Sequence, residues 1–87
     1  MANMNIREQI VNAMHETAVA MGSRITNELS DSVVLLESGL DSLGFAILVS
    51  RLEEDLGYDP FVLMEEPYYP RTLGEFVVIY ERYQPQS

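Results

Sequence analysis

Ser42 is the residue best placed to do chemistry, because its hydroxyl lies between Asp41 and Leu43 where a loop gives way to a predicted helix. A catalytic serine of the nucleophile-elbow type needs a glycine two residues before it and two residues after it, on a strand-to-helix turn. Leu40 stands in place of the first glycine, and no strand is predicted there. His15 falls in the middle of another predicted helix and lysine is absent, so no Ser–His or Ser–Lys pair is indicated. We therefore predict that the chain is not an enzyme, and a small hydrolase is only the third interpretation.

The acidic residues do not suggest a metal site. Read as an EF-hand loop, residues 31–42 would place Val33 and Leu35 where oxygen ligands belong, and Ser42 where a bidentate glutamate belongs. The acids Glu53–Asp55 are consecutive, so their side chains spread around a helix instead of converging on an ion. The chain has no cysteine, which excludes disulfides and thiolate metal sites. We expect no metal.

A purely structural role for Ser42 is the main alternative. Serine and aspartate are both preferred N-cap residues, so Asp41 and Ser42 together are an ordinary way to begin a helix. In this interpretation the chain is an acidic helical protein–protein adaptor that binds a partner helix, and Ser42 is only a helix cap.

Length and charge narrow the class of protein. The 87 residues suit one domain, 1–87, and the 47% hydrophobic content is too high for a disordered tail. The net charge of -9 disfavours nucleic acid and anionic membrane surfaces as partners and favours basic patches on other proteins. The opening "MANMNIREQI" does not resemble a signal peptide, and the apolar runs are too short to span a bilayer. We expect a cytoplasmic monomer without membrane insertion.

Two long segments have helical periodicity, Asn5–Met21 and Ser42–Leu56, because their apolar residues recur three and four positions apart. Asn5 can cap the first helix, and Asp41 and Gly57 suit the two ends of the second. The apolar stripe of the second helix consists of Phe45, Leu48, Leu52 and Leu56.

The last third of the chain predicts a short helix and then a longer one. Asp59 as cap and Pro60 at the first helical position begin the short helix, which Pro67 limits to one or two turns. The sequence "TLGE" is typical of a capping box, formed by Thr72 at the N-cap and Glu75 three residues later. The buried face of the final helix then consists of Leu73, Phe76, Val77 and Tyr80.

A long polar loop, Ser23–Asp41, joins the first two helices. We expect Val33–Leu36 to pack beneath it and hold Ser42 at the mouth of the second helix; a strand there is the weaker interpretation, since no second strand could pair with it. The fold class is therefore all-α, a four-helix bundle with three longer helices, one short third helix and a long first loop. Residues 1–4 and 84–87 are expected to fray.

The surroundings of the serine resemble a known family. "GLDSL", at the end of the long loop, and "RLEEDLG", later in the same helix, are similar to the acyl carrier protein and peptidyl carrier protein superfamily, of the freestanding type. The likeness in length, acidity and helix order covers nearly the whole chain. It implies that Ser42 carries covalent 4'-phosphopantetheine and that Asp41 and Leu43 help to present this serine.

The resemblance also implies a function and partners. The protein would hold acyl or aminoacyl intermediates as thioesters on the phosphopantetheine arm, so that the sulfur comes from the arm and not from cysteine. A phosphopantetheinyl transferase would attach the arm from coenzyme A with Mg²⁺, and an acyl- or aminoacyl-loading ligase would charge it. A downstream synthase or transferase with a basic docking patch would meet the second helix, where Glu53 and Glu54 match the family's acidic pair.

Three positions depart from the pattern of fatty-acid carriers. Gly44 and Ile47 stand where acids are usual, and Arg51 stands where a small neutral residue is usual. Peptidyl carriers usually have histidine at the position of Asp41. We therefore expect a carrier of a dedicated fatty-acid-like, polyketide or nonribosomal-peptide type of pathway. The residues expected to face its partners are Ala46, Ile47 and Ser50, together with Glu53 and Glu54.

Overall fold

The computed structural model describes residues 5–25 and 28–85. Within these ranges the chain forms four α helices and one 3-10 turn, with no strand. In order they are α1 (Ile6–Ala20), η1 (Leu35–Glu37), α2 (Ser42–Leu56), α3 (Pro60–Leu63) and α4 (Leu73–Arg82). The all-α prediction, with three longer helices and a short third one, is confirmed. The predicted fraying of 1–4 and 86–87 falls outside the described residues, whereas 84–85 are exposed and non-helical.

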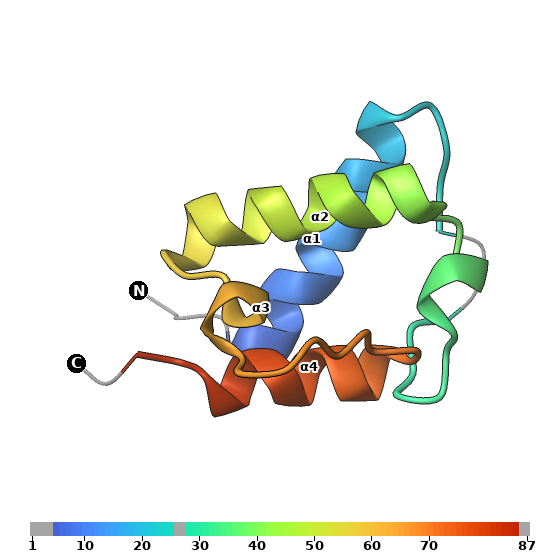
Figure 1. Cartoon of the computed structure of the whole chain (residues 1–87). Coiled ribbons are helices and arrows are strands. Elements are labelled where there is room, and N and C mark those ends of the chain that lie inside the picture. The colour runs from blue at the N-terminus through green and yellow to red at the C-terminus, as the bar shows by residue number, and fades with distance from the viewer. Residues whose placement is uncertain (1–4, 26–27, 86–87) are drawn as a thin grey trace.

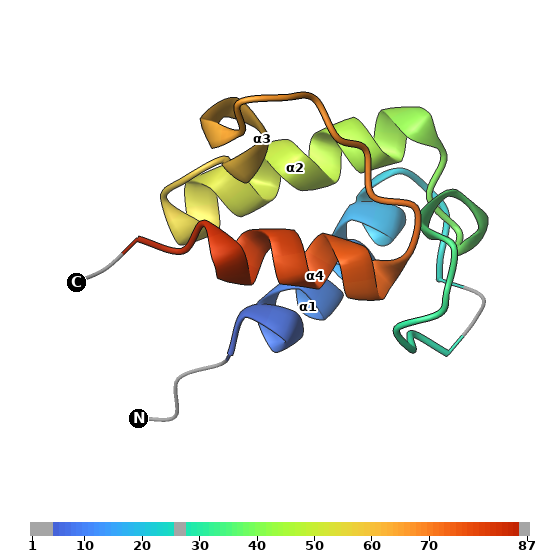
Figure 2. The same ribbon diagram turned by 60° about the horizontal axis from the view of Figure 1, so that its bottom comes forward.

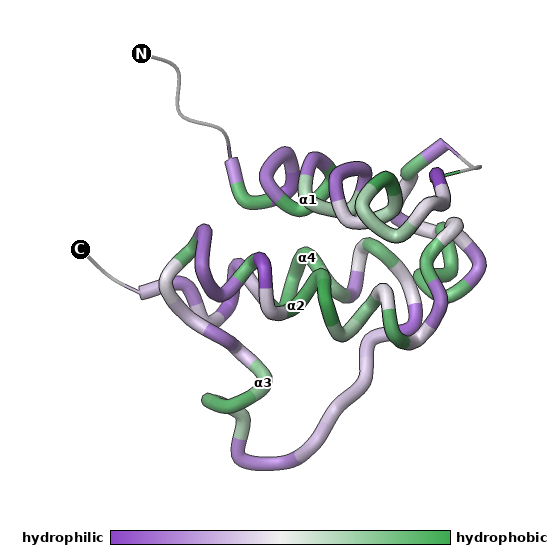
Figure 3. Tube along the Cα trace, turned by 90° about the horizontal axis from the view of Figure 1, so that it is seen from above, coloured by the Kyte–Doolittle hydropathy of each residue, from purple (hydrophilic) through white to green (hydrophobic). Residues whose placement is uncertain are grey.

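The three longer helices surround the core (Figures 1 and 2). α2 and α4 run in the same direction, and α1 packs against both of them. α3 and the segment that follows it lie to one side of the three longer helices, as the tube in Figure 3 shows. The loop that carries η1 lies at the end where α2 and α4 begin. This arrangement places the first turn of α2 beside the long loop.

α1 forms where the apolar spacing predicts it. The side chain of Asn5 accepts a hydrogen bond from the backbone N–H of Glu8 at 2.8 Å, which caps the helix. Ile10 and Met14, one turn apart, are completely buried. Gly22 follows the helix with a φ of 76°, a left-handed conformation that favours glycine. Burial of this stripe on α1 forms one wall of the core.

Aromatic rings fill the space between α2 and α4. Phe45 and Phe76 have ring centroids 5.3 Å apart, and Phe76 meets Tyr80 edge to face at 4.9 Å. Phe61, from α3, contacts both Phe76 and Tyr80. The hydroxyl of Tyr58 donates to the backbone carbonyl of Tyr80 at 2.5 Å. The short α3 is thereby fixed to α4 through its aromatic side chain.

α4 begins with the predicted capping box in a shifted form. Thr72 Oγ1 accepts from the N–H of Glu75 at 3.3 Å, as predicted. The carboxylate of Glu75 accepts from the N–H of Arg71 at 2.8 Å, one residue before the cap, and from the hydroxyl of Tyr68 at 3.2 Å. Glu75 therefore ties the incoming segment to α4 as well as capping the helix.

The long loop is tied to the start of α4 by backbone hydrogen bonds. Val34 forms a single antiparallel bridge with Thr72, in which Leu35 N–H donates to Arg71 and Leu73 N–H donates to Val33, both at 2.9 Å. The predicted burial of Val33–Leu36 is only partly correct, because the 3-10 turn directs Leu35 into the core and leaves Leu36 56% exposed. The strand that was the weaker interpretation for Val33–Leu36 does not form, although Val34 takes part in an isolated β-bridge.

Within the described residues, no helix is long and apolar enough to cross a membrane.

Candidate modification site at the start of α2

Ser42 is the first residue of α2, and its neighbour caps the helix. Asp41 has an extended backbone, and its Oδ1 accepts a hydrogen bond from the N–H of Gly44 at 2.8 Å. Asp41 O accepts the first helical bond, from the N–H of Phe45 at 2.9 Å. The interpretation of Ser42 as the cap is therefore wrong, because Asp41 has that role. Ser42 is exposed, and among the described residues its hydroxyl has no hydrogen-bond partner.

The turn before Ser42 is held by the two sides of the long loop. Ser38 is buried, and its hydroxyl donates to the carbonyl of Leu35 at 2.6 Å. Gly39 has a φ of 121°, and a Cβ at this position would lie 2.3 Å from the carbonyl oxygen of Arg24. The hydroxyl of Ser23 donates to Gly39 O at 3.0 Å. Close contact between the two sides of the loop therefore sets where α2 begins.

The end of α2 that carries Ser42 favours a negative charge. The first N–H groups of a helix lack partners within it, and the helix dipole adds positive partial charge there. α2 has 15 residues and its first turn contains no acidic residue, but the carboxylate of Asp41 lies at the cap directly before it. A phosphate attached to Ser42 would be favoured by the helix terminus and opposed by the charge of Asp41.

Within residues 5–25 and 28–85, no histidine or acid is hydrogen-bonded to the hydroxyl of Ser42. His15 is an exposed residue of α1, and no hydrogen bond between described residues joins it to Ser42. A search of the same residues finds no group of three His, Asp or Glu that could hold a metal ion. An isolated, neutral serine hydroxyl is a weak nucleophile.

The predicted partner-facing residues do share one side of α2. We use the term outer face of α2 for Leu43, Ala46, Ile47, Ser50, Glu53 and Glu54, which are three and four residues apart. Leu43 is 62% exposed, and only Ile47 in this set is partly covered. The outer face combines an apolar patch next to Ser42 with an acidic end.

Two of the departures noted in the sequence have an explanation within the fold. Gly44 is buried, and a Cβ there would lie 3.1 Å from Met21 Sδ and 3.2 Å from a methyl carbon of Leu40. Arg51 reaches α1, where its guanidinium lies 3.6 Å from the carboxylate of Glu16. Gly44 therefore permits close packing of Met21 and Leu40 against α2.

A cleft beside α2 was not anticipated from the sequence. It has a volume of about 480 Å³ and lies between α2 and the segment after α3. Its lining is mainly apolar and includes Phe45, Ala46, Val49, Phe61 and Met64. The signal that could have revealed it is Pro67–Pro70, since two prolines in an aromatic stretch hold the segment extended, away from a helical path.

The titrating groups with shifted pKa values lie on α4 and its neighbours. Burial, together with the charge of Asp59, raises the pKa of Tyr80 well above its usual range. Burial also raises the pKa of Tyr58. The N–H of Arg71 holds the pKa of Glu75 below its usual value, with help from Tyr68. These groups serve the packing of α4 and lie apart from Ser42 in sequence.

Comparison of the chain with models of protein families, with curated proteins and with solved structures finds no match. The functional conclusion therefore depends on the residues themselves.

Proposed function

We propose that the chain is an acyl carrier protein, with 4'-phosphopantetheine attached to Ser42. The observation that carries the proposal is the division of roles at the start of α2. Asp41 caps the helix, and the hydroxyl of Ser42 is exposed beside it without a partner among the described residues. The four helices and the long first loop support an acyl-carrier type of bundle.

The residues present fit the arm. Ser42 supplies the oxygen of a phosphodiester, and the N-terminal end of α2 stabilises its negative charge. The base and the Mg²⁺ for attachment come from the transferase, which suits a serine without a basic neighbour. The arm, when bound, supplies a thiol that holds acyl or aminoacyl groups as thioesters, and a cysteine-free chain has no thiol of its own.

The outer face of α2 is proposed as the surface that partners recognise. Leu43 gives the transferase an apolar contact directly beside the serine, and Glu53 and Glu54 attract basic patches. A loading ligase and a downstream synthase or transferase would use the same face in turn. Ile47, which stands where fatty-acid carriers have an acid, favours a dedicated pathway.

The cleft between α2 and the segment after α3 favours an acyl cargo over a charged aminoacyl one. Phe45, which lines it, lies one helical turn after Ser42. Its apolar lining would shield an aliphatic chain from water, whereas an ammonium group would lose hydration there.

Mass spectrometry of the intact protein tests the proposal. The protein is incubated with coenzyme A, Mg²⁺ and a transferase of broad specificity. We expect a gain of one phosphopantetheinyl group, absent in Ser42→Ala. An unchanged mass in a cooperatively folded sample, alongside an established carrier that is modified, would overturn the proposal. Ester hydrolysis by the unmodified protein would favour the hydrolase interpretation instead.

A further inference from the structure

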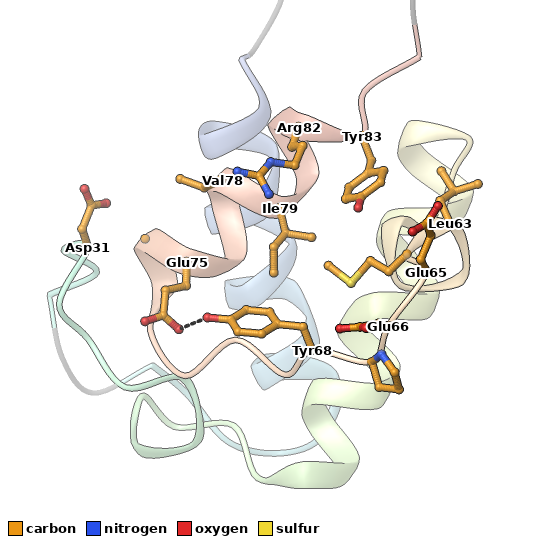
Figure 4. A pocket seen from close by; sticks show the side chains of 13 residues that line it. Asp31, Leu63, Glu65, Glu66, Tyr68, Glu75, Val78, Ile79, Arg82 and Tyr83 are labelled. Atoms are coloured by element: carbon orange, nitrogen blue, oxygen red, sulfur yellow. Dashed lines mark hydrogen bonds between the residues drawn. The ribbon is translucent and has the colours of Figure 1, made fainter.

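A second groove, which we call the α4 groove, lies between α4 and residues 63–68 (Figure 4). Its volume is about 930 Å³, and no residue of α2 lines it. Leu63 and Met64 come from one side, and Val78 and Ile79 come from α4 on the other. Ser42 does not line it, and it meets the cleft beside α2 along a shared wall of Met64, Glu65, Pro67 and Tyr68.

The groove exists because α4 has two faces that carry apolar residues. Leu73, Phe76, Val77, Ile79 and Tyr80 are the buried residues of α4. Val78 extends the apolar surface beyond them and is 52% exposed, and Ile79, which is 7% exposed, lines the bottom of the groove. On α4 they lie in a second stripe with Glu75, Arg82 and Tyr83, at helical spacing. The run "FVVIY" is more apolar than a helix with a single buried face requires.

A hydrogen bond crosses one end of the groove. The hydroxyl of Tyr68 donates to the carboxylate of Glu75 at 3.2 Å, joining the segment after α3 to α4 (Figure 4). Glu75 also accepts from the backbone of Arg71. These contacts favour the position of the segment that forms the groove, and such ordering before a partner binds lowers the entropic cost of binding.

The charges around the apolar floor indicate the chemistry of the occupant. Glu65 and Glu66 are exposed on one side, and Glu75 lies on the other. Asp31 adds a further acid at the edge, already paired with Arg7, and Arg82 is the one basic residue of the lining. Such a surface complements cations placed beside an apolar stripe. A second copy is a poor occupant, because each chain carries a net charge of -9 and the copies repel.

We propose that the α4 groove docks a basic amphipathic helix of a partner protein. Apolar side chains of that helix enter the floor formed by Leu63, Val78 and Ile79, and its lysines or arginines pair with Glu65 and Glu66. The site would work alongside the Ser42 site and does not depend on modification of that serine.

The test uses a blocked synthetic peptide of leucine and lysine, with leucines three and four residues apart so that one helical face is apolar. A peptide of the same composition in scrambled order controls for patterning, and a leucine–glutamate version controls for charge. Binding is measured by titration calorimetry, and the surface is located from NMR shifts of backbone amides. Ser42→Ala is used throughout, so that failure of the carrier proposal cannot influence the result.

We expect the patterned basic peptide to shift amides of 63–68 and 75–83, and the other two peptides to bind at least fivefold more weakly. Glu65→Gln/Glu66→Gln should weaken binding about fivefold, as loss of two exposed ion pairs would. Val78→Ser, at a half-exposed position where folding is little affected, should weaken it similarly.

The matched control is Glu28→Gln/Asp55→Asn, which removes the same charge from exposed positions outside both the α4 groove and the outer face of α2 and should leave peptide binding unchanged. Equal weakening by both double variants would show attraction to net charge alone and overturn the proposal. Amide shifts centred on the outer face of α2, or equal binding of the scrambled peptide, would also overturn it.

Discussion

The carboxylate of Asp41 accepts a hydrogen bond from the N–H of Gly44 at 2.8 Å, and this contact separates the roles of two adjacent polar residues. Asp41 caps α2 by accepting hydrogen bonds from Gly44 and Phe45, while Ser42 is exposed. A serine at a helix start that makes no capping hydrogen bond is available for modification. The proposed carrier function depends on this division.

Substitution of Asp41 should therefore lower the stability of the protein, whereas substitution of Ser42 should change it little. We expect Asp41→Ala to lower the free energy of unfolding by about 1 kcal/mol, while Asp41→Asn, which can still accept the hydrogen bond, loses much less. Ser42→Ala should stay within about 0.5 kcal/mol of the unaltered protein. Urea unfolding followed by circular dichroism measures all three. An equal loss in Ser42→Ala and Asp41→Ala would contradict the assignment of the cap.

The turn that presents Ser42 should be sensitive to a single methyl group. Gly39→Ala places a Cβ against the carbonyl of Arg24, at 2.3 Å in the present geometry. Gly22→Ala is the matched control, because Gly22 also has a positive φ but has no atom within 4 Å of an added Cβ. We expect about 1–2 kcal/mol of destabilisation from the control, which strains only the backbone. Gly39→Ala should cost about 1–3 kcal/mol more, because it adds a steric overlap. Similar unfolding midpoints for the two variants would show that the loop can move to accommodate the added methyl group at little cost.

Close packing at Gly44 gives a third prediction. Gly44→Val would crowd Met21 and Leu40, so we expect a loss of about 1–3 kcal/mol. Ala46→Val, two residues later on the exposed side of α2, adds a β-branched residue without that crowding and should cost less than about 1 kcal/mol. Thermal unfolding compares the pair. If the two midpoints coincide, a glycine at position 44 is not required for this packing.

The pH dependence of stability should include a contribution from Glu75. Its pKa is lowered in the folded protein, chiefly by the N–H of Arg71 and less by Tyr68. The contribution is therefore complete above the carboxyl's ordinary pKa and disappears as pH falls through the lower, folded-state pKa. The stability advantage over Glu75→Gln should shrink across that interval. Carbon-13 NMR should find the pKa of Glu75 still lowered in Tyr68→Phe, and a return to the ordinary value there would make the tyrosine the main cause.

The two acidic pairs should act on different partners. Glu53→Gln/Glu54→Gln should slow phosphopantetheinylation of Ser42 several-fold at low salt and reduce its dependence on ionic strength, because exposed charges steer association. Glu65→Gln/Glu66→Gln, which lines the α4 groove, should leave this rate unchanged. Rates are followed by intact mass over time. Equal slowing by both pairs would argue against recognition through the outer face of α2.

Helix positions followed well from the sequence because their signals are local. The predicted second helix, Ser42–Leu56, matches α2 in both bounds, and the caps at Asn5 and Asp41 are those observed. The position of Ser42 at the start of α2 also followed from the sequence. Capping side chains, periodic apolar residues and terminal glycines all act within a few residues of one another.

Features that depend on contacts between distant segments were missed. The bridge between Val34 and Thr72 involves residues that are far apart in the chain. The burial of Gly44 depends on Met21 and Leu40, and a glycine in a helix gives no hint of what packs against it. The α4 groove depends on the path that the segment after α3 takes beside Val78. None of these has a periodic signal, because each is decided by tertiary packing.

The bridge between Val34 and Thr72 has a consequence for how the molecule opens. Because Leu35 and Leu73 exchange hydrogen bonds with the opposite segment, the long loop cannot detach while α4 remains docked. The loop should therefore belong to the same cooperative unit as the last helix, and amide exchange at Leu35 and Leu73 should be as slow as global unfolding. Residues 33–35, which precede Ser42, would then be among the last parts of the chain to open, so that a transferase acting as proposed would meet a preformed surface.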